Sequence, residues 1–295
     1  MPRGRGIPSA RRPRGTPPVT EWQLTETFHS AAGEVRWGSL GRPDGDPVVL
    51  LHGTPFSSYV WRDIAHALAG HHQVFVWDMP GYGASEKSAG QDVSLAVQSR
   101  IFSQLLEHWG LDEPLVVAHD FGGAVSLRAH LLHGALYRAL ALVDPVALAP
   151  WGSPFFRLVG EQSEVFEQLP PALHRALVRE YVSSASSPGL HPTVLDQLVR
   201  PWLGDPGQGA FYRQIAQADQ RYTDEVQERY GEIAVPTLVC WGEDDTWIPV
   251  ARGRELAARI PDARFEPIAG AGHLVQEDAP ARLTALLLDF LRQPR

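Results

Sequence analysis

The sequence predicts an α/β fold, with a mostly parallel, twisted sheet, helices on both faces and a helical insertion. Three observations support this prediction. Short apolar runs without charge alternate with helix-like segments from residue 48 to residue 143. Such runs are typical of strands buried on both faces, and their alternation with helices implies parallel pairing. No strand-like run occurs from about residue 146 to residue 232, and the strand–helix alternation resumes at residue 237.

The composition is that of a globular protein and excludes several functional classes. Of 295 residues, 44% are hydrophobic and the formal net charge is -8, so nothing in the charge favours nucleic acid or an anionic membrane as partner. No apolar run approaches the roughly 18 residues of a membrane span. The single cysteine, Cys240, lies in an apolar run, where we expect a buried and inert thiol. These features favour a cytoplasmic location.

The first 18 residues differ from the rest of the chain. Met1–Pro18 contains five arginines, five prolines and almost nothing to bury, so we expect a disordered arm. It lacks the apolar core of a secretory signal. The predicted division of the chain is an arm at 1–18, an α/β core at 19–145 and 233–295, and a helical cap at 146–232.

The individual elements follow from local patterns. An antiparallel pair is expected at Trp22–Ser30 and Gly33–Gly38. Buried strands are predicted at Val48–Leu51, Gln73–Trp77, Leu115–Ala118, Ala139–Val143, Thr237–Trp241 and Ala263–Ile268. Helices are predicted at Trp61–Ala69, Val93–Trp109, Ala124–Leu132, Ala251–Ile260 and Pro280–Arg292.

One predicted strand leads directly into a reactive side chain. The run Leu115–Ala118 is followed by His-Asp-Phe-Gly-Gly at 119–123 and then by helix-forming residues. A sharp strand-to-helix turn with a reactive residue at its apex is a nucleophile elbow, usually written G-x-S-x-G. Here Ala118 takes the first glycine slot, Gly122 the second, and Asp120 the apex. The predicted nucleophile is therefore a carboxylate rather than a hydroxyl.

Two further loops follow predicted strands at the same edge of the sheet. His273 ends the glycine-rich segment 270–273, and Asp244 and Asp245 follow the strand that ends at Trp241. Open α/β folds build their sites at the carboxyl ends of the strands, and the order nucleophile, acid, histidine suits a catalytic triad. Asp144, at the end of another strand, is a further candidate for the acid that orients the histidine.

The loop at 52–55 provides the remaining part of a nucleophilic site. Its sequence, His-Gly-Thr-Pro, follows a strand that neighbours the elbow. We expect the backbone N–H groups of Thr54 and Phe121 to point at the Asp120 oxygen that becomes an oxyanion.

Together these motifs resemble the α/β-hydrolase superfamily over essentially Trp22–Arg292. The aspartate elbow and the segments 52–55 and 77–85 are similar to the branch that holds epoxide hydrolases and haloalkane dehalogenases. The resemblance implies that Asp120 displaces an epoxide oxygen or a halide to form an enzyme ester. It also implies that His273 then activates the water that hydrolyses this ester. The family places its acid three residues after Gly242, which assigns Asp245.

The same resemblance separates the two activities by the donors that each requires. In the branch, a halide is held by N–H donors, typically a tryptophan after the nucleophile together with an asparagine or a second tryptophan. Phe121 and Thr54 occupy the two usual positions, so only Trp151 or Trp202 from the insertion would remain as substitutes.

An epoxide instead needs an acid for its leaving oxygen, and the family uses cap tyrosines. The motif at 211–213, Phe-Tyr-Arg, matches Tyr212 to this acid, with Tyr181 as a possible second tyrosine. The leading prediction is therefore epoxide hydrolysis, and haloalkane or haloacid dehalogenation is the alternative. A biosynthetic cyclase or lyase and a non-catalytic receptor on the same fold are further alternatives.

The aromatic residues of the insertion imply an apolar pocket for a small to medium hydrophobic substrate, with water as the second reactant. No phosphate loop, metal-ligand cluster or dinucleotide fingerprint occurs in the sequence, so we expect neither a cofactor nor a metal. The oligomeric state, monomer or homodimer, stays open. The residues expected to line the pocket are His52, Trp151, Phe155, Tyr181, Trp202 and Leu274.

Overall fold

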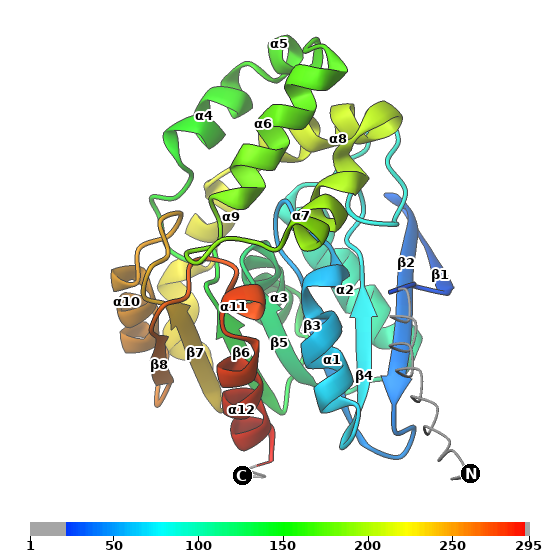
Figure 1. Ribbon diagram of the computed structural model, residues 1–295. Helices are drawn as coiled ribbons and strands as arrows, with labels where there is room; N and C mark the ends of the chain where they lie inside the picture. The colour runs from blue at the N-terminus through cyan, green and yellow to red at the C-terminus, as the bar shows by residue number, and fades with distance from the viewer. Residues whose placement is uncertain (1–21, 293–295) are drawn as a thin grey trace, which may run out of the picture.

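The computed structural model describes residues 22–292, so the predicted arm Met1–Pro18 lies outside the described residues. Its centre is an eight-stranded sheet in the order β1-β2-β4-β3-β5-β6-β7-β8 (Figure 1). The strands are β1 (Glu26–Ser30), β2 (Gly33–Gly41), β3 (Asp46–Leu51), β4 (His72–Trp77), β5 (Leu115–His119), β6 (Ala139–Val143), β7 (Thr237–Gly242) and β8 (Arg264–Ile268).

The sheet is mostly parallel, as the sequence predicts. Only β1 and β2 run antiparallel to their neighbours, whereas β4, β3, β5, β6, β7 and β8 pair in parallel. Every residue of β5, β6 and β7 is buried, because helices cover both faces of these central strands. This burial explains why the central strands are uncharged apolar runs, and the predicted α/β fold class is confirmed.

Helices pack on both faces of the sheet (Figure 1). On one face α2 packs against α3, and on the other α1 packs against α12. None of the helices within residues 22–292 is both long and apolar enough to cross a membrane. The helices outside the connection from β6 to β7 are η1 (Ser58–Trp61), α1 (Arg62–Leu68), α2 (Leu95–Trp109), α3 (Phe121–His133), α10 (Ala251–Arg259), α11 (Val275–Asp278) and α12 (Pro280–Leu291).

A group of helices joins β6 to β7 and lies beyond the carboxyl ends of the parallel strands (Figure 1). Within residues 144–236 the structure contains helices and turns but no strand. These helices therefore cover the edge of the sheet at which a site is expected. They are α4 (Pro154–Glu161), α5 (Ser163–Glu167), α6 (Pro171–Ser183), α7 (Pro192–Val199), η2 (Arg200–Trp202), α8 (Gly204–Ala216), α9 (Arg221–Asp224) and η3 (Gln227–Glu232).

Candidate active site

Asp120 occupies a strained turn between β5 and α3. Its backbone has φ 50° and ψ -118°, a combination that is costly for a residue with a Cβ and that packing must maintain. The turn also needs two glycines. A Cβ at Gly122 would lie 2.6 Å from the carbonyl oxygen of His52, and one at Gly123 would lie 2.3 Å from Cβ of Pro145. The elbow therefore depends on small residues immediately after the aspartate.

The two oxygens of the Asp120 carboxylate have different partners. Oδ1 accepts a hydrogen bond of 2.6 Å from the backbone N–H of Thr54. Oδ2 lies 3.4 Å from Nε2 of His273. Within residues 22–292, the partners of this carboxylate are these two groups and not the N–H of Phe121, so the expected part of Phe121 in an oxyanion hole stays a prediction.

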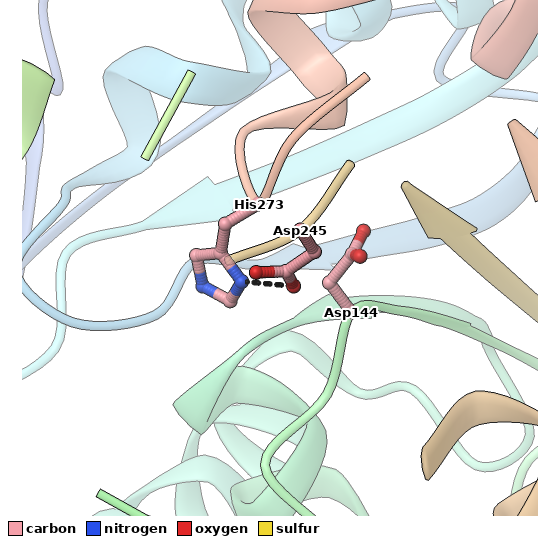
Figure 2. Close-up of side chains that lie close together, drawn as sticks. All are labelled: Asp144, Asp245 and His273. Carbon is pink, nitrogen blue, oxygen red and sulfur yellow. Dashed lines mark hydrogen bonds and ion pairs between the residues drawn. The ribbon is translucent and has the colours of Figure 1, made fainter. Parts of the chain in front are cut away.

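His273 is oriented by Asp245, which lies on the far side of its ring from Asp120. Nδ1 of His273 is 2.9 Å from Oδ2 of Asp245 (Figure 2). Oδ1 of Asp245 accepts hydrogen bonds from the backbone N–H groups of Trp247 and Ile248, at 2.7 and 2.9 Å. Because these bonds fix the carboxylate, the histidine is held with Nδ1 towards Asp245 and Nε2 towards Asp120.

The two other acids considered from the sequence make different contacts. Asp244 accepts a hydrogen bond of 2.9 Å from the hydroxyl of Ser187, in an exposed position. Asp144 is buried and accepts a hydrogen bond of 2.9 Å from the N–H of Gly242. Neither has a hydrogen bond to His273, so of the three acids the structure pairs Asp245 with the histidine.

The charges around His273 set its protonation. Burial disfavours the imidazolium, but the carboxylates of Asp245 and Asp120 outweigh burial and raise the pKa of His273 well above its usual value. The ring of His119 lies next to that of His273, with centroids 4.9 Å apart, and its pKa shifts in the opposite direction. Burial and the charge of His273 lower the pKa of His119 to about 3. His119 donates from Nε2 to the backbone oxygen of His273 at 2.9 Å, and so supports the loop as a neutral ring.

A small, mainly apolar pocket opens onto Asp120. Aromatic rings from the elbow, the cap and the loop after β7 dominate its walls. Its lining suits a hydrophobic molecule. The lining residues are Thr54, Asp120, Phe121, Val146, Trp151, Gly152, Ser153, Phe156, Tyr181, Trp247 and Ile248.

Of the six residues expected to line the pocket, Trp151 and Tyr181 do so and the other four do not. His52 is fully buried beneath the site, where Nε2 accepts from the N–H of Met79 and Nδ1 donates to the oxygen of Gly53. Phe155 packs against Tyr181, with ring centroids 5.0 Å apart.

The two remaining residues are buried in the packing around the site. Trp202 donates its indole N–H to the backbone oxygen of Pro55 at 2.6 Å. Leu274 is completely buried beside His273 in the sequence. The prediction of these four as lining residues is wrong because sequence position does not specify which way a side chain points.

The structure places Tyr212, which the sequence matched to the ring-opening acid, away from the pocket. Tyr212 is fully buried within the cap and does not line the pocket. Its hydroxyl lies 2.8 Å from Nδ1 of His174, whose Nε2 lies 2.8 Å from the backbone oxygen of Trp202. Since a carbonyl only accepts, Nε2 carries the proton, and Tyr212 must donate its own proton to Nδ1. Burial also raises the pKa of Tyr212 to about 12.

Trp247 is a site residue that the sequence analysis missed. Its ring stacks on His273 at a centroid distance of 4.9 Å and on Tyr181 at 4.5 Å. Its indole N–H donates to the hydroxyl of Ser184 at 3.0 Å. Trp247 thus joins the cap to the histidine. Its position two residues after Asp245, in a loop at the carboxyl edge of the sheet, is the signal that would have identified it.

Within the described residues, one group of potential metal ligands has donor atoms within 4.8 Å of one another: Asp144, Asp245 and His273. Oδ2 of Asp245 and Nδ1 of His273 are already hydrogen-bonded to each other. Oδ1 of Asp245 and Oδ1 of Asp144 each accept a hydrogen bond from a backbone N–H. This arrangement is that of a hydrogen-bonded acid–base array.

Comparison with known proteins places this fold in a family. A family model described as alpha/beta hydrolase fold matches residues 46–280. The chain belongs to the α/β-hydrolase fold family. An α/β-hydrolase fold protein from Burkholderia ambifaria, known as a crystal structure, is 47% identical with a TM-score of 0.88. The match covers 91% of this chain and 98% of that one.

Two other proteins that are similar to the chain have named activities. The chain is 26% identical over 274 residues to Haloalkane dehalogenase 2 of Mycobacterium tuberculosis, covering 89% of this chain and 93% of that protein. The epoxide hydrolase CorEH superposes with a TM-score of 0.70 at 21% identity, covering 90% of this chain and 97% of that one. This last likeness concerns the fold alone.

Proposed function

We propose that this α/β-hydrolase is an epoxide hydrolase that works through a covalent ester on Asp120, with a small to medium hydrophobic epoxide and water as substrates. The main support is the placement of the Asp120 carboxylate at the pocket. One oxygen is held by a backbone N–H and the other faces a histidine that is itself oriented by an acid. A carboxylate needs no base before it attacks, so His273 is free for the second step.

In the first step, Oδ2 of Asp120 attacks an epoxide carbon and the carbon–oxygen bond of the ring breaks. The alkoxide that forms takes a proton from Tyr181. This tyrosine lines the pocket, and within residues 22–292 its hydroxyl makes no hydrogen bond to another protein group. Burial and the Asp120 charge raise the pKa of Tyr181, so its proton stays in place until the strongly basic alkoxide forms.

In the second step, His273 activates water. Conversion of Asp120 into an ester removes one of the two negative charges that raise the pKa of His273. The pKa of His273 then falls, so the imidazolium gives up its proton, which restores the Tyr181 hydroxyl. The neutral Nε2 then accepts a proton from the water that attacks the ester carbonyl. Thr54 donates its N–H to the oxyanion, and Asp245 stabilises the imidazolium. The ester bond between the carbonyl carbon and the diol oxygen breaks, and this oxygen takes the second proton of the water. The diol leaves, and the Asp120 carboxylate and the His273 imidazolium are restored.

The indole groups favour an epoxide over a halide. Phe121, next to the nucleophile, has no ring N–H. The indole N–H groups of Trp151, Trp202 and Trp247 donate to Oγ1 of Thr223, the oxygen of Pro55 and Oγ of Ser184. A departing halide would need such donors free and pointed at it, whereas the alkoxide of an epoxide needs a single acid.

Haloalkane dehalogenation is the second candidate, because Haloalkane dehalogenase 2 resembles 89% of the chain. Assays with styrene oxide and with 1-bromohexane, measuring diol and bromide, separate the two activities. We expect diol and no bromide. Bromide without diol would overturn the epoxide assignment.

The intermediate itself provides the sharper test. A His273→Gln variant should form the ester on Asp120 but fail to hydrolyse it, so intact mass spectrometry should show the adduct. An epoxide adds its whole mass because no group leaves, whereas a bromoalkane adds only its alkyl group in place of one hydrogen. The double variant with Asp120→Asn is the control and should stay unmodified. An adduct that persists in this control would contradict the role of Asp120.

A further inference from the structure

Asp144 is a buried acid that the proposed reaction does not use. It follows β6 with φ 43°, in the left-handed region that is costly for any residue except glycine, and its side chain is completely buried. Figure 2 shows Asp245 between His273 and Asp144, so the two carboxyl groups lie next to each other.

The two acids have very different numbers of hydrogen-bond donors. Asp245 accepts from the N–H groups of Trp247 and Ile248 and from Nδ1 of His273. Asp144 accepts at Oδ1 from the N–H of Gly242 alone. Its Oδ2 is buried and has no hydrogen-bond partner within the described residues. A proton on this oxygen would make it a donor to the neighbouring Asp245 carboxylate.

These environments determine where a shared proton resides. Two carboxylates with oxygens within 4.8 Å of each other in a buried site are not both ionised. The repulsion between like charges adds to the cost of burying each one. Donors stabilise the ionised form, and Asp245 has three of them whereas Asp144 has one. Asp245 is therefore the anion, and the proton belongs on the oxygen of Asp144 that has no other partner.

We propose that Asp144 is a neutral carboxylic acid that donates a hydrogen bond from Oδ2 to the Asp245 carboxylate and so acts as a positioning residue for the Asp245–His273 pair. A carboxylate has about four acceptor sites on its two oxygens. With the O–H of Asp144, these sites are filled by four donors, two of them backbone N–H groups. The acid is then held on every side without another charge being added.

The electrostatics agree with the geometry. Burial and the negative charge of Asp245 raise the pKa of Asp144 well above its usual value. An ionised Asp144 would add a third negative charge beside His273 and would hold the imidazolium proton more strongly. A neutral Asp144 adds no charge and leaves the hold on this proton unchanged. The benefit of a neutral Asp144 to turnover rests on the proposed function of Asp120, His273 and Asp245.

Infrared spectroscopy tests the proton directly and needs no substrate. The difference spectrum between the wild-type protein and Asp144→Asn at neutral pH should contain the C=O stretch of one protonated carboxylic acid. The band should shift in D2O and on labelling aspartate with carbon-13. The exposed control Asp196→Asn should produce no such band. Absence of the band for Asp144 would overturn the proposal, whether or not the protein turns over an epoxide.

Kinetics test the positioning role. Asn at position 144 keeps a neutral donor and an acceptor, so Asp144→Asn should keep kcat within about twofold and leave the acid limb of the pH profile in place. Asp144→Ala removes the donor to a charged group, so kcat should fall about 10-fold with KM unchanged. A kcat for Asp144→Asn that is as low as that of Asp144→Ala would overturn the positioning role. If the alanine variant does not fold, the pH profile of Asp144→Asn decides instead. An acid limb displaced from that of the wild-type protein would also overturn the positioning role.

Discussion

Replacing Gly53 by alanine is expected to displace the proposed nucleophile, Asp120, while leaving the fold intact. Gly53 is next to Thr54, whose N–H holds the Asp120 carboxylate. It is not among the described glycines with positive φ, so its backbone accepts an alanine. The difficulty is space, because an added Cβ would lie 2.3 Å from Oδ1 and 2.4 Å from Cβ of Asp120.

The size of the effect follows from these distances. Real Cβ contacts essentially never fall below 3.0 Å, so the carboxylate or the loop must move by about 0.7 Å from the 2.3 Å contact. A misplacement of about 1 Å at a reacting group can cost about 100-fold in rate. We therefore expect kcat of Gly53→Ala to fall between about 10-fold and 100-fold.

Steady-state turnover and the rate of ester formation in the His273→Gln background measure this loss. Gly209→Ala is the matched control, because a Cβ there meets nothing within 4 Å. Gly209 lies in α8, so alanine should stabilise the protein by about 0.5 to 1 kcal/mol without changing kcat. A Gly53→Ala variant with wild-type kcat would refute the assignment of the Asp120–Thr54 contact to catalysis.

Two further predictions concern the cap tyrosines and the charge on the nucleophile. Tyr181→Phe should lower kcat on epoxides about 100-fold. Tyr212→Phe should leave kcat within about twofold but lower the free energy of unfolding by about 1 to 3 kcal/mol, because Nδ1 of His174 loses its donor. Kinetics and denaturant unfolding distinguish the two, and the reverse pattern would restore Tyr212 as the acid. Asp120→Asn should lower the pKa of His273 in an NMR titration, because one attracting charge is gone. The imidazolium stabilises the fold fully below about pH 6.5 and loses this effect as the pH rises through its raised pKa. In Asp120→Asn that loss should come at lower pH, and an unchanged pKa would contradict the charge coupling.

The fold class and the order of the elements were predictable because they depend on local patterns. Central strands between helices are uncharged apolar runs, as in Val48–Leu51 and Ala139–Val143, and a short sequence window identifies them. The elbow at Asp120 and the loops of Asp245 and His273 were found in the same way. Parallel strands bring their carboxyl ends to one edge, so residues just after them must lie together.

Contacts between distant parts of the chain decided which side chains of the cap and loops face the pocket. Tyr212 meets His174 across 38 positions, and the indole of Trp202 meets Pro55 across 147, so both side chains point away from the pocket. The rotation of each cap helix about its axis depends on packing against other helices, and no local pattern encodes it. The sequence by itself therefore determined the fold and the candidate nucleophile, histidine and acid. Only the tertiary structure decided that Tyr181 and Trp247, rather than Tyr212 and Trp202, face the nucleophile, because side-chain direction follows from long-range packing.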